Sequence, residues 1–217
     1  MIRPRGEGGL DFSDSMFNRT GLYTLMRPLV DALTGAEGEQ WLRKAADIEI
    51  FKMVSALSPE RFRALEISGR NWEGRVRFKS YAAIDYPEHD VCKAIPPGDY
   101  DIIIAEHVFE HLLYPYRAAK NVHDALKPGG YFLMVTPFLV GLHPCPHDCT
   151  RWTPEGARFF LAEAGFPMEP IQTGSWGNRQ CVKGNFNWAV RYRRRLHSLK
   201  NESNLPVTVW ALARKPA

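Results

Sequence analysis

Three apolar segments, at residues 64–67, 81–84 and 100–106, constrain the fold of this chain more than any other feature. Each ends at small or acidic residues, and a fourth apolar segment, at 131–137, follows a helix-ending Lys-Pro-Gly-Gly sequence. In an open α/β sheet, ligands bind outside the carboxyl ends of the parallel strands. The pattern therefore predicts such a sheet, with a nucleotide-type cofactor pocket along the edge where the segments end.

Asp85 is the first candidate for a residue of this pocket. It follows the second apolar segment directly and lies roughly 20 residues beyond the end of the first. An acidic side chain at this distance can accept hydrogen bonds from ribose hydroxyls. Asp85 is therefore predicted to bind the ribose of a nucleotide cofactor.

Four motifs in this order resemble the class I S-adenosylmethionine-dependent methyltransferases. They are Leu-Glu-Ile-x-Gly at 65–69, Ile-Asp at 84–85, Asp-Ile-Ile-Ile-x-x-x-Val-Phe-Glu-His at 101–111 and Leu-Lys-Pro-Gly-Gly at 126–130. A later sequence, Arg-Trp-Thr-Pro-Glu-Gly at 151–156, is similar to small-molecule and sugar-modifying bacterial members of that family. The resemblance covers about residues 60 to 167.

The resemblance implies an α/β fold with a Rossmann-like, seven-stranded, mostly parallel sheet and helices on both faces. An antiparallel C-terminal strand pair is expected at 169–173 and 207–213. The connection from 86 to 98 is too short for the family's usual helix and third strand, so we expect it to be abbreviated. Asp90, within this connection, either contacts the adenine or has a capping or solvent-exposed role.

Apolar residues recur at helical spacing in two N-terminal segments, 22–33 and 39–57. We expect residues 1–58 to form a helical extension packed on the core. Residues 59–217 are then expected to form the methyltransferase-like α/β domain, as a single compact unit.

The resemblance also implies S-adenosyl-L-methionine as the cofactor. Glu66 would hold backbone amides of the following turn or the cofactor's amino group, and Gly69 lets the chain pass close to the cofactor. The turn is degenerate, because only Gly69 remains where the family has Gly-x-Gly-x-Gly. Arg70 either binds the methionine carboxylate or lies on the surface. The predicted cofactor-binding residues are Glu66, Ser68, Gly69, Arg70, Asp85, Tyr86, Ala105, Glu106 and His107.

The resemblance implies that the loop at 142–152 lies over the acceptor site, because the family has substrate contacts there. His143, His147 and His107 are candidate catalytic bases, since imidazole titrates near neutral pH. Asp148 would orient a histidine and Arg151 would bind an acidic group. The predicted substrate-contacting residues are Tyr23, Arg27, Asp148 and Arg151, although core packing is favoured for Tyr23.

The same loop contains alternating ligand types, His-x-Cys-x-His-x-Cys at 143–149, which suit zinc. Residues two apart in an extended chain are ~6.5 Å apart, so the four would span about 20 Å and need sharp turns to surround one ion. We therefore expect no metal site. After the loop, Thr153 is predicted to cap a helix that begins at Pro154, with Trp152 packed beneath.

The whole-chain properties bound the function less tightly. Much of the net charge of +4 comes from a basic cluster at 191–200, which is either a patch for phosphate-bearing ligands or, as we favour, a solvated helix face. The four cysteines have no disulfide-framework spacing, so we expect them to be reduced. No apolar run reaches the ~20 residues of a membrane span, and no signal sequence is visible. We expect a cytoplasmic protein with no membrane partner.

These observations predict a biosynthetic S-adenosylmethionine-dependent methyltransferase with a small-molecule acceptor, most simply an oxygen of a sugar or secondary metabolite. One alternative is a methyltransferase-like binding protein without catalytic activity, suggested by the degenerate glycine turn. Another is a nucleic-acid methyltransferase that binds its substrate through the basic cluster. We favour nucleic acid less than a small molecule as the partner. The chain is expected to be a monomer or a homodimer.

Overall fold

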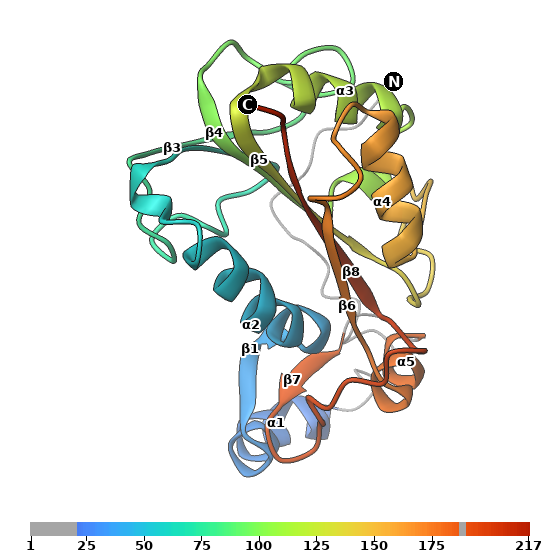
Figure 1. The fold of residues 1–217 in the computed structure, drawn as a ribbon. Coiled ribbons are helices and arrows are strands. Elements are labelled where there is room, and N and C mark those ends of the chain that lie inside the picture. The colour runs from blue at the N-terminus through green and yellow to red at the C-terminus, as the bar shows by residue number, and fades with distance from the viewer. Residues whose placement is uncertain (1–20, 187–189) are drawn as a thin grey trace.

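The computed structural model describes residues 21–186 and 190–217, and their side chains from residue 25 onward. A six-stranded sheet has the order β3-β2-β4-β5-β8-β6 (Figure 1). Its first four strands are mutually parallel, and β8 runs antiparallel to both neighbours. The strands are β2 (Arg63–Ile67), β3 (Ser80–Ile84), β4 (Tyr100–Glu106), β5 (Leu126–Pro137), β6 (Gln172–Trp176) and β8 (Thr208–Arg214).

The predicted Rossmann-like α/β class and the antiparallel C-terminal pair are confirmed, but the main sheet has six strands in the described part of the chain instead of seven. The difference lies in the connection between β3 and β4. Residues 85–99 form turns and irregular structure, without the usual helix and third strand. The abbreviated connection that its length predicted is therefore observed.

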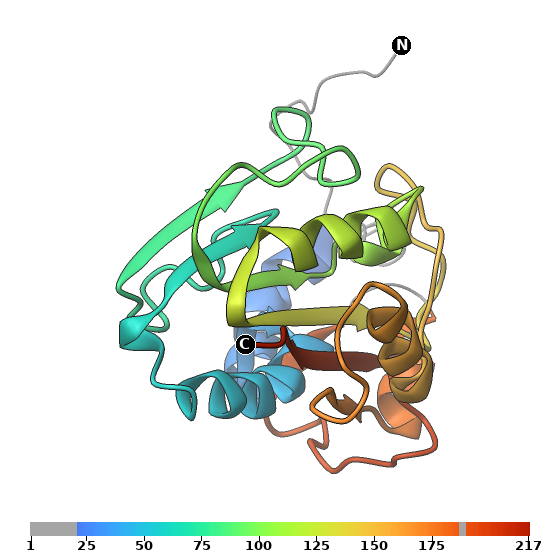
Figure 2. The same cartoon turned by 45° about the horizontal axis from the view of Figure 1, so that its top comes forward.

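Helices cover both faces of the sheet, and Figure 2 shows α3 and α2 on opposite sides of it. The helices are α1 (Gly21–Thr34), α2 (Trp41–Ser55), α3 (Pro115–Ala125), α4 (Pro154–Glu163) and α5 (Arg179–Asn185), with 3₁₀ turns η2 (Pro59–Arg61) and η3 (Phe109–His111). None of these helices has the length and apolar character that a membrane-spanning segment requires. The predicted division of the chain at residue 58 stays a prediction.

Side chains alternate between two hydrophobic cores along each central strand. On β4, Ile103 and Ala105 pack with α3 and α4, whereas Ile102 and Ile104 pack with α2. The same alternation continues on β5 and β8. Because successive residues of a strand point to opposite faces, a strand that is apolar throughout is buried on both sides. These continuous apolar runs therefore place β4 and β5 at the centre of the sheet, with their carboxyl ends at the candidate site.

The basic cluster is a strand and a turn, so the predicted helix face is wrong. β7 (Arg191–Arg193) pairs antiparallel with β1 (Ala36–Gln40), a strand that the sequence did not predict. Arg193 forms an ion pair with Asp31 at 3.2 Å, and Arg195 Nη1 donates to the Leu33 carbonyl at 2.7 Å. Part of this positive charge therefore holds α1 against β7 and the turn that follows it.

The helix cap predicted at Thr153 is present and can be tested. Its side-chain oxygen accepts a hydrogen bond from the Gly156 amide at 3.0 Å, and Pro154 occupies the first turn of α4. Thr153→Ala should lower the free energy of unfolding by about 1 kcal/mol, measured by urea denaturation, because one amide of the first turn loses its partner. Thr153→Ser keeps the hydroxyl and should retain most of the stability. Equal losses in both variants would contradict the capping role.

Candidate cofactor and acceptor site

The turn after β2 is organised by the carboxylate of Glu66. This side chain is 1% exposed and accepts hydrogen bonds from the amides of Asn71 and Trp72 at 2.8 and 3.0 Å. The Tyr81 hydroxyl donates a third hydrogen bond to it at 2.6 Å. Burial, followed by this hydrogen bond to the Glu66 carboxylate, raises the pKa of Tyr81. Glu66 therefore holds the turn's backbone amides, which is one of the two roles predicted for it.

Ser68 and Gly69 carry the chain through left-handed backbone conformations at the end of β2. Their φ angles are +63° and +110°, values that favour glycine at the second position. The Gly69 amide donates to Asp85 Oδ1 at 3.0 Å, which joins the ends of β2 and β3. Within the described part of the chain, Asp85 Oδ2 has no hydrogen-bond partner. Asp85 is exposed, so this oxygen remains available beside the turn at Ser68 and Gly69.

Glu106, the last residue of β4, lies beneath this turn. It is 7% exposed, and its Oε1 accepts a hydrogen bond from Trp72 Nε1 at 3.0 Å. Arg43 of α2 approaches its other oxygen at 3.9 Å. Burial, reinforced by the nearby charge of Asp47, raises the pKa of Glu106 to about 7, against an ordinary value of 4.5. The carboxyl group therefore titrates near neutral pH.

Three polar residues follow β4 and face the loop after β5. His107 has a left-handed backbone with φ of +54°, and burial lowers the pKa of its imidazole. Its Nδ1 lies 3.7 Å from Glu110 Oε1, and His111 Nε2 lies 3.6 Å from the same oxygen. Glu110 is 0% exposed. A left-handed non-glycine residue directly after a strand is typical of a functional site.

The loop after β5 is tied to this group of side chains. Its Cys149 amide donates to the Glu110 carbonyl at 2.7 Å, and the rings of His143 and His111 are in edge-to-face contact at 5.0 Å between centroids. Asp148 binds the Arg151 guanidinium through both oxygens and accepts from the His143 amide at 2.9 Å. Burial opposes ionisation of Asp148, but these hydrogen bonds outweigh it and lower its pKa.

The structure brings together most of the predicted residues, although it leaves their roles as predictions. Two groups of contacts gather along the carboxyl edge of the sheet, one around the β2 turn and one around η3. The first includes Glu66, Ser68, Gly69, Asp85 and Glu106, and the second includes His107, His143, Asp148 and Arg151. His147 joins the second group through its backbone carbonyl, and its side chain is exposed.

Other predicted residues do not converge so closely. Arg70 is exposed and pairs with Glu73 at 3.2 Å, which favours the surface alternative, and Tyr86 is 60% exposed. Ala105 is fully buried in the core. Arg27 forms an ion pair with Asp31 in α1. The Tyr23 side chain lies outside the described residues.

The site residues predicted from the sequence did not include Arg43, Trp72 or Glu110. Arg43 comes from α2, and no sequence signal connects it to β4. Trp72 was visible as a departure from the family's glycine pattern, and its burial beneath the turn explains why that position tolerates a large side chain. Glu110 follows β4 closely enough that the rule placing site residues after strands would have included it.

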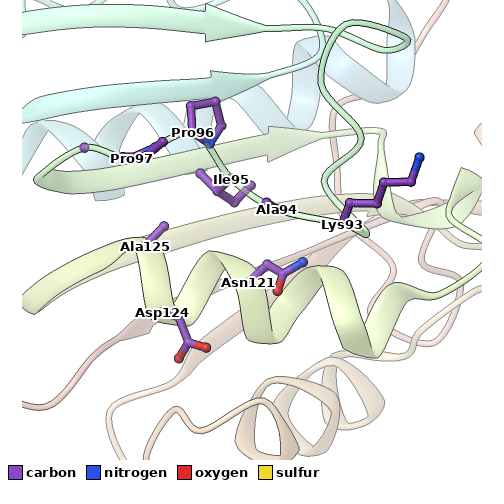
Figure 3. A pocket seen from close by; sticks show the side chains of 9 residues that line it. Lys93, Ala94, Ile95, Pro96, Pro97, Asn121, Asp124 and Ala125 are labelled. Atoms are coloured by element: carbon purple, nitrogen blue, oxygen red, sulfur yellow. The ribbon is translucent and has the colours of Figure 1, made fainter.

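Two open hollows lie outside this edge of the sheet. One of about 350 Å³ is at the amino-terminal side of β4, where residues 93–98 face the end of α3 (Figure 3). Lys93 and Asn121 line it along with Asp124. The other, of about 360 Å³, is bounded by α4 and Thr173 of β6. Neither includes the residues gathered at the strand ends.

The parallel sheet, with acidic residues after neighbouring strands, defines a Rossmann-like nucleotide-cofactor protein. The chain belongs to the methyltransferase domain family, whose model matches residues 21–167. The predicted class, an S-adenosylmethionine-dependent methyltransferase using that cofactor, is confirmed by this assignment. The match begins at residue 21, within the predicted N-terminal extension.

Comparisons with individual proteins agree on the fold. A solved S-adenosylmethionine-dependent methyltransferase from Mesorhizobium loti superimposes with a TM-score of 0.53 at 14% identity, covering 76% of this chain and 97% of that one. A putative S-adenosylmethionine-dependent methyltransferase from Listeria monocytogenes gives 0.52 at 14% identity, covering 80% and 99%. Highly reducing polyketide synthase 2 of Gibberella zeae is 30% identical over 102 residues, which are 41% of this chain and 4% of the synthase. The chain thus matches only a small part of that protein.

The raised pKa of Glu106 predicts a pH-dependent stability difference. In the unfolded chain the carboxyl titrates near 4.5, and in the folded protein near 7. Its protonated form therefore contributes stability below about pH 4.5, and this contribution is lost as the pH rises to 7. Relative to Glu106→Gln, wild-type protein should lose up to about 3 kcal/mol of unfolding free energy across this range, measured by urea denaturation. Parallel pH profiles would contradict the burial argument.

Proposed function

We propose that this methyltransferase transfers the methyl group to an oxygen of a small-molecule acceptor. The observation that carries the proposal is the group of imidazole and carboxylate side chains after β4, next to the turn that joins Gly69 to Asp85. Methyl transfer requires chiefly that donor and acceptor be held in line and that water be excluded. Histidines add a means of removing a hydroxyl proton.

The residues at the ends of β2 and β3 fit the cofactor. In this proposal Asp85 Oδ2 accepts a hydrogen bond from a ribose hydroxyl, because Oδ1 already accepts one from the Gly69 amide. Ser68 is exposed and Gly69 is half-buried, and the Glu66 carboxylate keeps the turn in this shape. When bound, the cofactor supplies an electrophilic methyl carbon on a sulfonium centre. Arg70 has a smaller part in this proposal, since its guanidinium already pairs with Glu73.

Among the predicted bases, we assign proton removal to His107. It directly follows β4, and its amide donates to the Val135 carbonyl at 2.8 Å, which fixes its position between β4 and β5. Its side chain is 15% exposed, so it can meet an acceptor while remaining mostly shielded from water. Asp148 and Arg151 hold the loop through their mutual ion pair, and contact of Arg151 with an acidic acceptor remains a prediction.

A small acceptor is favoured over nucleic acid by the distribution of charge. Within the described residues, the basic cluster uses Arg193 and Arg195 to hold α1, and the strand ends carry mainly acidic and histidine side chains. A phosphate backbone is usually bound by unpaired Lys and Arg side chains. The non-catalytic alternative predicts cofactor binding without turnover, or no binding at all.

Cofactor binding can be measured by calorimetric titration with S-adenosylmethionine and S-adenosylhomocysteine. Asp85→Asn should weaken both by roughly 10- to 100-fold, because a hydrogen bond to a charged group contributes about 1.5–3 kcal/mol. Glu88→Gln removes an exposed neighbouring carboxylate and serves as the matched control, with unchanged affinity. If the wild-type protein binds neither S-adenosylmethionine nor S-adenosylhomocysteine, the assignment of this site to the cofactor is wrong.

Turnover is tested by transfer of a labelled methyl group to panels of hydroxylated small molecules, RNA and DNA. With an accepted substrate, His107→Asn should lower turnover by about 10²- to 10⁴-fold while cofactor affinity stays within a few-fold. Asparagine is chosen because it tolerates the left-handed backbone at this position. Labelling of RNA or DNA alone would favour the nucleic-acid alternative. Binding without any transfer would favour the non-catalytic one.

A further inference from the structure

We propose that Glu110, His111 and His143 bind a divalent transition-metal ion, most favourably Zn²⁺. One nitrogen or oxygen atom from each residue lies within 4.8 Å of the others. Two of the residues come from η3, and the third comes from the loop after β5. The residues of that loop alone predict no metal site, and the two ligands from η3 change this expectation.

The state of the Glu110 carboxylate is the first argument. The side chain is fully buried, and neither oxygen has a hydrogen-bond partner in the described part of the chain. Burying an ionised carboxylate is costly unless it is hydrogen-bonded, paired or bound to a metal. Glu66, equally buried, accepts three hydrogen bonds. Glu110 instead faces imidazole nitrogens, which are metal ligands in their neutral form.

The orientation of His111 is the second argument. Its Nδ1 lies 2.5 Å from the His147 carbonyl oxygen. Since a carbonyl can only accept, Nδ1 donates, and in the neutral ring the lone pair is then on Nε2. That atom lies 3.6 Å from Glu110 Oε1, close to the ~3.4 Å that separates two ligands of a tetrahedral zinc ion. Metal-binding histidines usually donate their other nitrogen to a carbonyl or carboxylate in this way.

The third argument is that the two segments of the site are held together independently of any ion. The Cys149 amide bonds to the Glu110 carbonyl, and the Asp148 carboxylate accepts from the His143 amide. Arg151 in turn holds Asp148. These contacts position His143 beside η3, so little reorganisation is needed to complete a coordination sphere.

The ligand set indicates the type of ion. Two imidazoles and one carboxylate suit Zn²⁺, whereas Mg²⁺ and Ca²⁺ prefer oxygen ligands only. Three protein ligands leave a zinc position open for water or substrate. Resting on the proposed function, we infer that the acceptor hydroxyl binds at this position, where the ion would lower its pKa before proton transfer to His107.

The site is tested by stripping the 217-residue protein with a chelator and titrating Zn²⁺ against a chromophoric competitor. Wild-type protein should bind one equivalent, and Glu110→Gln and His143→Ala should each weaken binding by at least about tenfold. His89→Ala removes an exposed histidine elsewhere and should have no effect. Cys149→Ser should also leave affinity unchanged. A loss in Cys149→Ser, equal binding in all variants, or no binding by the wild-type protein would each overturn the proposed ligand set.

Two further readouts separate this inference from the proposed function and from loss of folding. Zn²⁺ should raise the melting temperature of wild-type protein but not of Glu110→Gln, and Co²⁺ in its place should give the visible absorption bands of a tetrahedral site. Cofactor affinity is measured on the same metal-free samples. If the protein binds the cofactor but not zinc, only the metal site is wrong. If it binds zinc but not the cofactor, the proposed methyltransferase function is wrong and the metal site is retained.

Discussion

The buried carboxylate of Glu66 is the interaction on which the carboxyl edge of the sheet depends. A carboxylate at 1% exposure is stable only when hydrogen bonds replace its lost hydration, and here two turn amides and a tyrosine hydroxyl do so. In binding those amides it bends the chain back after β2. This bend brings the Gly69 amide to Asp85 and the Trp72 indole to Glu106. A single acidic residue thereby sets the positions of the groups at the ends of three strands.

Two more buried carboxylates lie along the same edge, and each is accommodated differently. Glu106 accepts one indole hydrogen bond and lies 3.9 Å from Arg43, and burial raises its pKa to about 7. Glu110 has no hydrogen bond in the described part of the chain and faces two histidines. Hydrogen bonding to the buried carboxylate thus decreases from Glu66 through Glu106 to Glu110, that is, from the cofactor side of the site toward the loop after β5. The hydrogen bonds that hold the turn after β2 explain why Glu66 is buried. The burial of Glu110 is explained only by a bound ligand or a proton.

The central strands and the cofactor edge could be predicted from the sequence because their signals are local. Apolar runs buried on both faces, each followed by small or acidic residues, identify parallel strands and the edge where they end. The pairing of β1 with β7 joins segments more than a hundred residues apart, and strand preference in such short polar stretches depends on the partner. For the same reason the sequence pattern of the basic cluster wrongly predicted a helix. The group formed by Glu110, His111 and His143 also depends on two distant segments meeting.

The identity of the acceptor is harder to predict from the sequence than the cofactor-binding residues, and the reason is physical. In the proposed site the cofactor contacts come from strand ends, whose positions the sheet determines, whereas neighbouring residues come from the loop after β5 and from α2. The loop is held by a few side-chain contacts, chiefly Asp148 with Arg151 and the bond from Cys149 to Glu110. α2 contributes Arg43, whose charge opposes the rise in the Glu106 pKa. Changes in these two segments can therefore alter acceptor choice and local charge while the sheet, and with it the cofactor geometry, stays the same.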